Sequence, residues 1–441
     1  MSVFQQEGNR LKYHYDAEEL WLEPWGANSL RVRATKEAEM PKESWALLEA
    51  PECGAEIEIT EDGARIKNGK IRAEVSKYGK ITFYNQKGKL LLEEYSRTRK
   101  DLFAKTCSAL EVEPREFKPI LGGDYRLTVR FEAGDKNEKI YGMGQYQQEL
   151  LNLKGADLEL AHRNSQASVP FALSNKGYGL LWNNPAIGSV TFGKNLTEWT
   201  ALSTRQMDYW ITAGDTPAEI EEAYADATGK VPMMPDYGCG FWQCKLRYQT
   251  QEELLEVARE YKRRGLPISV IVADYFHWPH QGDWKFDKDY WPDLKAMVDE
   301  LEGMGIKLMV SIWPTVEEGS ENFKEMEELG YLSRNDYGKR MHQLGNAAIM
   351  DPTNPDARKY VWSKIKKNYY DDGVRIFWLD EAEPEFTNYE YGNHRFYLGS
   401  DLEIGNIFPR EYARMAYEGM EGEGQRSEER RVGKECRSRW S

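Results

Sequence analysis

The sequence predicts a multidomain α+β protein, in which an N-terminal β-sandwich precedes an incomplete (β/α)₈ TIM barrel of about four strand-helix units. Three observations predict this fold class. Residues 1–230 contain short runs of alternating polar and apolar residues between turn residues, with almost no helical periodicity. After residue 231, apolar runs of strand length alternate with helical patterns, which indicates parallel strands joined by helices. The length of 441 residues also exceeds the usual size of one core.

The N-terminal region, residues 1–230, is predicted to be the β-sandwich. Its clearest predicted strands are Ala55–Thr60, Lys70–Val75, Arg126–Phe131 and Tyr178–Trp182. The first helix is predicted to begin at Pro217, with Asp215 or Thr216 as its N-cap, and to end near Gly229. The proline-rich stretch 231–235 then reads as a stiff linker, so we expect the domain boundary there.

Residues 231–425 are predicted to form the first half of the barrel. A short apolar run opens at Phe241, and the other predicted strands are Ile268–Asp274, Lys307–Trp313 and Val374–Asp380. Helical patterns follow at about 250–264, 292–304, 321–329 and 355–370. The carboxyl ends of barrel strands converge on one rim, which carries the active site. Because two of these runs end in aspartate and a third in tryptophan, Asp274, Trp313 and Asp380 are candidate site residues.

The last apolar run, 376–379, stops at a cluster of four carboxylates. They are Asp380, Glu381, Glu383 and Glu385. One interpretation is a buried strand that delivers its final residue to a barrel rim. The alternative is a solvated acidic turn that caps the next helix, with Pro384 marking the break. Asp274 is open to the same helix-cap interpretation, and Trp313 to that of an ordinary core residue.

The net charge of -14 argues against a nucleic-acid or anionic-membrane partner, since either would need a basic surface. No run approaches the roughly 20 apolar residues of a membrane span, and no signal-peptide pattern follows Met1. We therefore expect a cytoplasmic protein with reduced cysteines. His277 and His280 flank Trp278, but without an acidic partner at ligand spacing they do not predict a metal site. No cofactor is expected, and the oligomeric state is left unpredicted.

Six short motifs follow one another along the chain. They are Tyr141–Gly144, Gly177–Trp182, Gly238–Gln243, Ala273–Phe276, Trp291–Asp293 and Phe377–Pro384. Their combination resembles glycoside hydrolase family 31, the retaining α-glucosidases and α-xylosidases. The first motif resembles the YGxG turn of that family, and the last looks like its nucleophile motif WxDxxE. The resemblance extends from about residue 50 to about residue 425.

The resemblance implies a role for each matching residue. Asp380 would be the catalytic nucleophile, and Glu383 would support its loop. Asp274 would hydrogen-bond sugar hydroxyls, while Trp313 and Trp378 would pack against the sugar ring. A carboxylate suits attack on an anomeric carbon, because the covalent ester divides one difficult displacement into two easier ones. The substrate would be an oligosaccharide or another α-glycoside.

The sequence departs from the family at the second carboxyl group of the reaction. A retaining glycosidase needs a general acid about 5–5.5 Å from its nucleophile, and in the family this aspartate lies downstream in a segment that reads like WSGD. No such segment occurs in this sequence, although residues 411–420 look like the helix that precedes it. We therefore expect the chain to lack the acid/base and to be catalytically incomplete, because a leaving group without protonation is hard to expel.

Residues 426–441 differ in character from the rest, with six Lys or Arg against three Glu. We expect a foreign, non-native tail, and an ordinary disordered basic tail is the alternative.

Substrate and reaction type have alternatives too. The motif Glu-Ala-Glu-Pro after Asp380 resembles the α-xylosidase branch of the family, so we expect α-xylosides rather than α-glucosides as substrates. Glu381 and Glu385 are expected in the loop or at the rim of the pocket. A non-catalytic carbohydrate-binding protein and an α-transglycosylase are the other functions that this sequence allows.

Overall fold

The computed structural model describes residues 3–100, 108–343, 347–386 and 389–424. It divides the chain into two compact units, residues 1–231 with 402–406, and residues 232–401 with 407–441. The prediction of more than one domain is therefore confirmed. The predicted foreign tail, residues 426–441, lies outside the described residues. Within the described part, no helix combines the length and the apolar character needed to cross a membrane.

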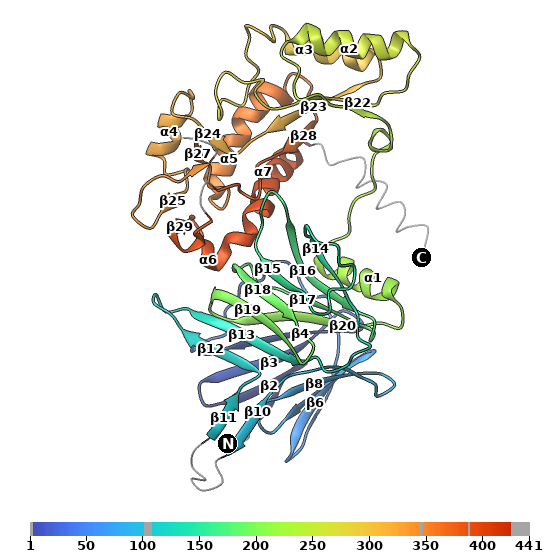
Figure 1. Cartoon of the computed structure of the whole chain (residues 1–441), viewed down its shortest axis with the longest axis vertical. Coiled ribbons are helices and arrows are strands. Elements are labelled where there is room, and N and C mark those ends of the chain that lie inside the picture. The colour runs from blue at the N-terminus through green and yellow to red at the C-terminus, as the bar shows by residue number, and fades with distance from the viewer. Residues whose placement is uncertain (1–2, 101–107, 344–346, 387–388, 425–441) are drawn as a thin grey trace. The chain divides into compact units, whose positions relative to one another are not determined.

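The first unit is built mainly from three antiparallel sheets (Figure 1). The largest has eight strands in the order β1-β2-β3-β4-β20-β17-β16-β14. Its strands are β1 (Phe4–Glu7), β2 (Arg10–Tyr15), β3 (Glu18–Trp25), β4 (Ser29–Thr35), β14 (Ile140–Gln145), β16 (Ala167–Ser174), β17 (Tyr178–Trp182) and β20 (Met207–Ala213).

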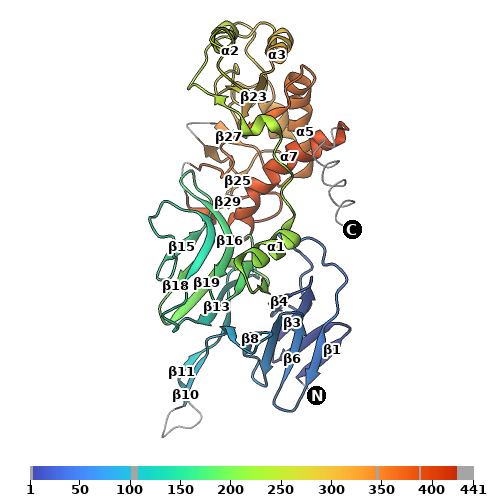
Figure 2. The same cartoon turned by 90° about the vertical axis from the view of Figure 1, so that its right-hand side faces the viewer.

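The other two sheets have five strands each. One has the order β12-β13-β19-β18-β15, with β12 (Arg115–Pro119), β13 (Tyr125–Glu132), β15 (Asp157–Leu160), β18 (Gly188–Phe192) and β19 (Leu196–Thr204). The other follows the chain, with β5 (Glu56–Ile59), β6 (Gly63–Asn68), β7 (Ile71–Ser76), β8 (Ile81–Asn85) and β9 (Leu90–Glu93). A hairpin of β10 (Arg97–Lys100) and β11 (Ser108–Val112) projects from the unit (Figures 1 and 2).

Strands β17 and β20 are buried along their whole length. On one face of their sheet, Tyr209 belongs to a large core to which all three sheets contribute. On the other face, Trp210 packs with Ile220 of helix α1 (Pro217–Thr228) in a smaller cluster. Because both faces are covered, the run 178–182 has no exposed position for polar residues to occupy.

A segment from far along the sequence, residues 402–406, belongs to the first unit. The side-chain Nδ2 of Asn406 donates to the carbonyl oxygens of Leu160 and Ala186, both at 2.9 Å. The backbone N–H of Asn406 donates to the carbonyl of Pro185 at 3.0 Å. Contacts to backbone carbonyls tie this segment to the first unit, and no local pattern in the sequence indicates them.

The second unit contains a four-stranded parallel sheet in the order β21-β22-β23-β28. Its strands are β21 (Trp242–Gln243), β22 (Val270–Ala273), β23 (Lys307–Ile312) and β28 (Ile376–Leu379). Strand β22 is fully buried, whereas β28 at the edge is partly exposed throughout. The three longer strands each end one residue before the predicted run ends, so the residue that the sequence singled out comes directly after the strand.

The helices after α1 are α2 (Gln251–Arg263), α3 (Leu294–Gly303), α4 (Phe323–Glu328), α5 (Pro355–Ile365), α6 (Asp401–Ile404) and α7 (Phe408–Gly422). Helix α3 begins later than predicted because Asp293 caps it and accepts the N–H of Ala296 at 2.9 Å. Figure 2 shows α2 and α3 side by side. Helix α5 continues into a single π-helical turn, Lys366–Tyr370.

The sequence did not predict the short strands in the loops of the second unit. They are β24 (Thr315–Val316), β25 (Arg334–Asn335), β26 (His342–Gln343), β27 (Ala347–Ile349) and β29 (His394–Arg395). Strands of this length show no recognisable period, so sequence patterns cannot reveal them.

Candidate active site

Four side chains follow the four strands of the parallel sheet. Directly after β21, β22, β23 and β28 come Cys244, Asp274, Trp313 and Asp380. Neighbouring parallel strands run in the same direction, so these four residues share one edge of the sheet. The sequence predicted three of the four. Cys244 was missed because β21 is only two residues long.

Asp274 is 8% exposed and its carboxylate has two donors. Its Oδ1 accepts the N–H of Tyr275 at 2.8 Å, and its Oδ2 lies 3.7 Å from the thiol of Cys244. The next helix along the chain is α3, which Asp293 caps. Asp274 therefore does not serve as a helix cap, which was the alternative interpretation of this residue.

Trp313 is the centre of a cluster of aromatic rings. Its ring stacks on Tyr275, with centroids 5.2 Å apart and planes at 29°. The rings of Phe276 and Trp278 lie 5.9 and 5.6 Å away. Trp284 Nε1–H donates to the carbonyl of Trp313 at 3.0 Å, which fixes the backbone at the end of β23. Trp313 and Trp278 are buried in this cluster, whereas Phe276 is 43% exposed and presents apolar ring surface.

Asp380 is half-buried, and its backbone is held from two directions. Its N–H donates to the carbonyl of Ile312 at 3.0 Å, and the hydroxyl of Tyr412 donates to the same carbonyl at 3.0 Å. Burial raises the pKa of Asp380, and the negative charges of Asp274 and Glu385 add to the rise. No pattern around Tyr412 indicated this contact, since it joins positions far apart in the sequence.

The indole of Trp313 also acts on Asp380. Its buried N–H makes no hydrogen bond of normal geometry within the described residues, yet it lies near enough to oppose the rise in the pKa of Asp380. The backbone N–H of Glu381 has the same effect. The groups that act on the pKa of Asp380 are thus a neutral indole, a backbone N–H and other acids.

The rest of the acidic cluster is less exposed than a solvated turn would be. Glu381 is 9% exposed and has a left-handed backbone with φ of 54°, a conformation that is uncommon outside glycine. The sequence left open whether Glu381 faces solvent, and the structure buries it. Burial also raises the pKa of Glu383, and the charge of Asp380 adds to that rise.

Trp378 lies in β28, two residues before Asp380, which directly follows the strand. At 36% it is more exposed than Trp313, which is 7% exposed. The structure thus brings Asp274, Trp313, Asp380 and Glu383 close together, and leaves Trp378 with an accessible ring.

The two histidines have different surroundings. His280 is exposed and lies 3.3 Å from Glu317, whereas His277 is buried against Tyr369. Among the described residues, no three His, Cys, Asp or Glu side chains converge as metal ligands would.

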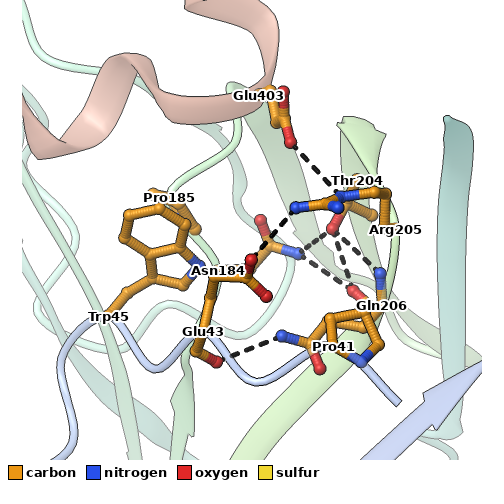
Figure 3. Close-up of a pocket in the computed structure, with 9 residues that line it drawn as sticks. All are labelled: Pro41, Glu43, Trp45, Asn184, Pro185, Thr204, Arg205, Gln206 and Glu403. Atoms are coloured by element: carbon orange, nitrogen blue, oxygen red, sulfur yellow. Dashed lines mark hydrogen bonds and ion pairs between the residues drawn. The ribbon is translucent and has the colours of Figure 1, made fainter. Parts of the chain in front are cut away.

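The first unit carries a shallow pocket of its own (Figure 3). It is lined by Pro41, Glu43, Trp45, Asn184, Pro185, Thr204, Arg205, Gln206 and Glu403. Arg205 pairs with Glu43 at 3.2 Å and with Glu403 at 3.8 Å, so its charge is already neutralised. The free space of about 20 Å³ suits a water molecule and is too small for a sugar.

Two family models match the chain. Residues 20–190 match the glycosyl hydrolase 31 N-terminal galactose mutarotase-like domain. Residues 231–435 match the glycosyl hydrolases family 31 TIM-barrel domain.

Individual proteins are similar as well. An uncharacterized family 31 glucosidase, ORF2, from Pseudescherichia vulneris is 52% identical over 96% of this chain and 82% of its own length. Alpha-xylosidase A from Aspergillus niger is 30% identical over 95% of this chain and 61% of its own length. The crystal structure of an α-xylosidase from a soil metagenome, complexed with xylose, has a TM-score of 0.92 and 59% identity. It covers 96% of this chain, which spans 64% of that enzyme.

Proposed function

The chain belongs to glycoside hydrolase family 31, as its motifs predicted, and on this premise we propose that it is a retaining α-glycosidase that acts on α-xylosides in preference to α-glucosides. The preference is supported by the α-xylosidases among its relatives, one of them at 59% identity. The motif Glu-Ala-Glu-Pro after Asp380 points in the same direction.

In this proposal Asp380 is the nucleophile. Its carboxylate oxygen forms a bond to the anomeric carbon while the leaving group departs with the bonding electron pair, and water later hydrolyses the resulting ester. Glu383 supports the loop that carries Asp380. Asp274 accepts hydrogen bonds from sugar hydroxyls, and the indole rings of Trp313 and Trp378 pack against the C–H faces of the sugar.

One observation supports these roles most strongly. Asp274, Trp313 and Asp380 directly follow three adjacent parallel strands, and the charge of Asp274 is close enough to raise the pKa of Asp380. Barrel enzymes place their reacting groups at this edge of the sheet. A carboxylate that is not paired with a cation keeps more of its negative charge available for attack than one that is held by arginine.

The proposal includes a restriction on the leaving group. The sequence contains no WSGD-like segment, so we propose that the chain as it stands has no general acid for the first step. Glycosides whose leaving group must be protonated should then react slowly. A glycosyl fluoride, whose fluoride leaves readily without a proton, should still form the covalent intermediate.

The test uses an α-xylosyl fluoride that carries a second fluorine at C5, which slows hydrolysis of the intermediate. Intact-protein mass spectrometry should show one added fluoroxylosyl group, and peptide mapping should locate it on Asp380. Asp380→Ala should remove the adduct. Asp289→Asn, which changes an exposed acid in a loop, is the matched control and should react like the parent protein.

Three outcomes would contradict parts of the proposal. An adduct that persists in Asp380→Ala rules out this nucleophile. Xylose binding without any adduct indicates a carbohydrate-binding protein. Rapid cleavage of an alkyl α-xyloside, which needs protonation, shows that a general acid is present after all.

A further inference from the structure

His277 is a buried histidine whose two ring nitrogens both have polar partners. Its side chain is 1% exposed. Nδ1 lies 2.9 Å from the carbonyl oxygen of Asp274, and Nε2 lies 2.9 Å from the hydroxyl of Tyr369. Its ring also packs against the rings of Trp278 and Phe286, with centroids 4.7 and 4.5 Å away.

These partners determine where the protons lie. A carbonyl oxygen only accepts, so Nδ1 must carry the hydrogen that points to Asp274. In a neutral ring Nε2 is then the acceptor, and Tyr369 donates its O–H to it. Burial lowers the pKa of His277 to about 4, so the ring is neutral near pH 7.

The loop that His277 holds is under backbone strain. Phe276, between Asp274 and His277, has a left-handed backbone with φ of 58°, which is unfavourable for an aromatic residue. The carbonyl of His277 accepts the N–H of Asp287 at 2.8 Å, so the histidine is itself anchored. A strained turn persists only where surrounding contacts over-determine it, and the bond from Nδ1 to Asp274 closes this turn.

We propose that His277 is a positioning residue, which in its Nδ1–H form donates to the Asp274 carbonyl and so fixes the direction of the Asp274 carboxylate towards the sugar. This inference rests on the proposed function, since it gives Asp274 the role of holding sugar hydroxyls. Tyr369 completes the arrangement because its hydroxyl selects the tautomer that leaves Nε2 without a hydrogen.

The tautomer can be tested without any ligand. In a ¹⁵N spectrum of protein labelled at histidine, His277 should show a protonated Nδ1 and an unprotonated Nε2, the reverse of the form that is usual in water. Tyr369→Phe should shift the Nε2 signal. A spectrum in which His277 carries its hydrogen on Nε2 would overturn the proposal.

The positioning role is tested by two substitutions that each preserve one of the two contacts. In His277→Asn the amide nitrogen replaces Nδ1 and can still donate to Asp274. In His277→Gln the amide replaces Nε2 and reaches only Tyr369. Xylose binding is followed by intrinsic tryptophan fluorescence. The affinity should stay near the parent value in the Asn variant and weaken by about tenfold in the Gln variant, as expected for one buried hydrogen bond.

Controls separate this inference from the proposed function. His280→Gln changes an exposed histidine and should bind xylose like the parent protein. Equal losses in the Asn and Gln variants would show that His277 merely fills space, and would overturn the proposal. His277→Asn leaves the hydroxyl of Tyr369 without its acceptor Nε2. If this variant does not fold, the double variant with Tyr369→Phe removes that hydroxyl and can be compared with the Gln variant instead. If the parent protein does not bind xylose, the proposed function is contradicted. The ¹⁵N spectrum still tests whether His277 carries its hydrogen on Nδ1, because that measurement needs no ligand.

Discussion

Glu94 in the first unit is fully buried and Asp380 in the second is half-buried, and the two acids have opposite kinds of partner. Both oxygens of Glu94 accept from Nη1 of Arg115, at 2.6 and 2.5 Å, and one also accepts the N–H of Ile81 at 2.8 Å. Nε of Arg115 donates to Glu18 at 2.8 Å. Around Asp380, in contrast, the partners are an indole, a backbone N–H and further acids.

This difference distinguishes two uses of a buried carboxylate. An acid that is paired with a cation and fully hydrogen-bonded links the segments that carry the pair, and removal of the cation leaves an uncompensated buried charge. An acid among neutral donors and other acids makes the folded state less stable, but it keeps its oxygens available for chemistry. Within the described residues, no cation lies within ion-pair distance of Asp274, Asp380 or Glu383. The following variants test this contrast.

The largest effect is expected for Arg115→Met. This change leaves the buried Glu94 without its cation, and it should lower the free energy of unfolding of the first unit by about 3–5 kcal/mol. Urea unfolding followed by circular dichroism measures the loss. Lys67→Met, which breaks an exposed pair with Glu56, is the matched control and should change stability by less than about 1 kcal/mol. Adding Glu94→Gln to Arg115→Met should recover part of the loss, and no recovery would argue against an uncompensated charge as its cause.

A smaller effect is expected for Tyr412→Phe. The hydroxyl shares the carbonyl of Ile312 with the N–H of Asp380, so its loss should cost about 1 kcal/mol of stability and slow the trapping of a fluorinated xylosyl group on Asp380. Trapping rates are measured by mass spectrometry over time. Tyr337→Phe, at a site 83% exposed, should leave the rate unchanged. A normal trapping rate in Tyr412→Phe would show that the hydroxyl contributes to stability alone.

The smallest effect is a gain in stability. Because the pKa of Asp380 is raised in the folded protein, its ionisation disfavours folding, and this cost is present above the raised pKa and absent below the ordinary one. Asp380→Asn should therefore raise the melting temperature at pH 7 by about 1–3 °C, and the gain should vanish as the pH falls through the raised pKa. A gain of equal size at pH 3 would point to packing as its cause. Asp289→Asn should show no gain at either pH.

The sequence predicted those candidate site residues that end a recognisable apolar run. Asp274, Trp313 and Asp380 each follow four or more strand residues, and such runs have a visible length and composition. Cys244 follows a strand of two residues, which has neither. The partners Tyr369 and Tyr412 were missed for a different reason, because their contacts join helical residues to a distant loop at His277 and to the distant strand β23 at Ile312. Local periodicity indicates which face of a helix is buried but does not indicate what lies opposite.

The helix boundaries show the same limit on a smaller scale. The pattern around Pro292 predicted a helix correctly, and only the hydrogen bond from Ala296 to Asp293 determines where it begins. The orientation of Glu381 was left open, since neighbouring charges in a sequence carry no information about burial. The structure answers the question because it buries Glu381, which is 9% exposed.

The attachment of residues 402–406 to the first unit has a consequence for biosynthesis. Asn406 supplies the donors for carbonyls of Leu160 and Ala186, so the first unit is made from two separate stretches of chain. A ribosome that has released residues 1–231 has not yet made the stretch that completes it. The N-terminal unit should therefore reach its full resistance to proteolysis only after residue 406 has emerged, later than a continuous domain of the same size.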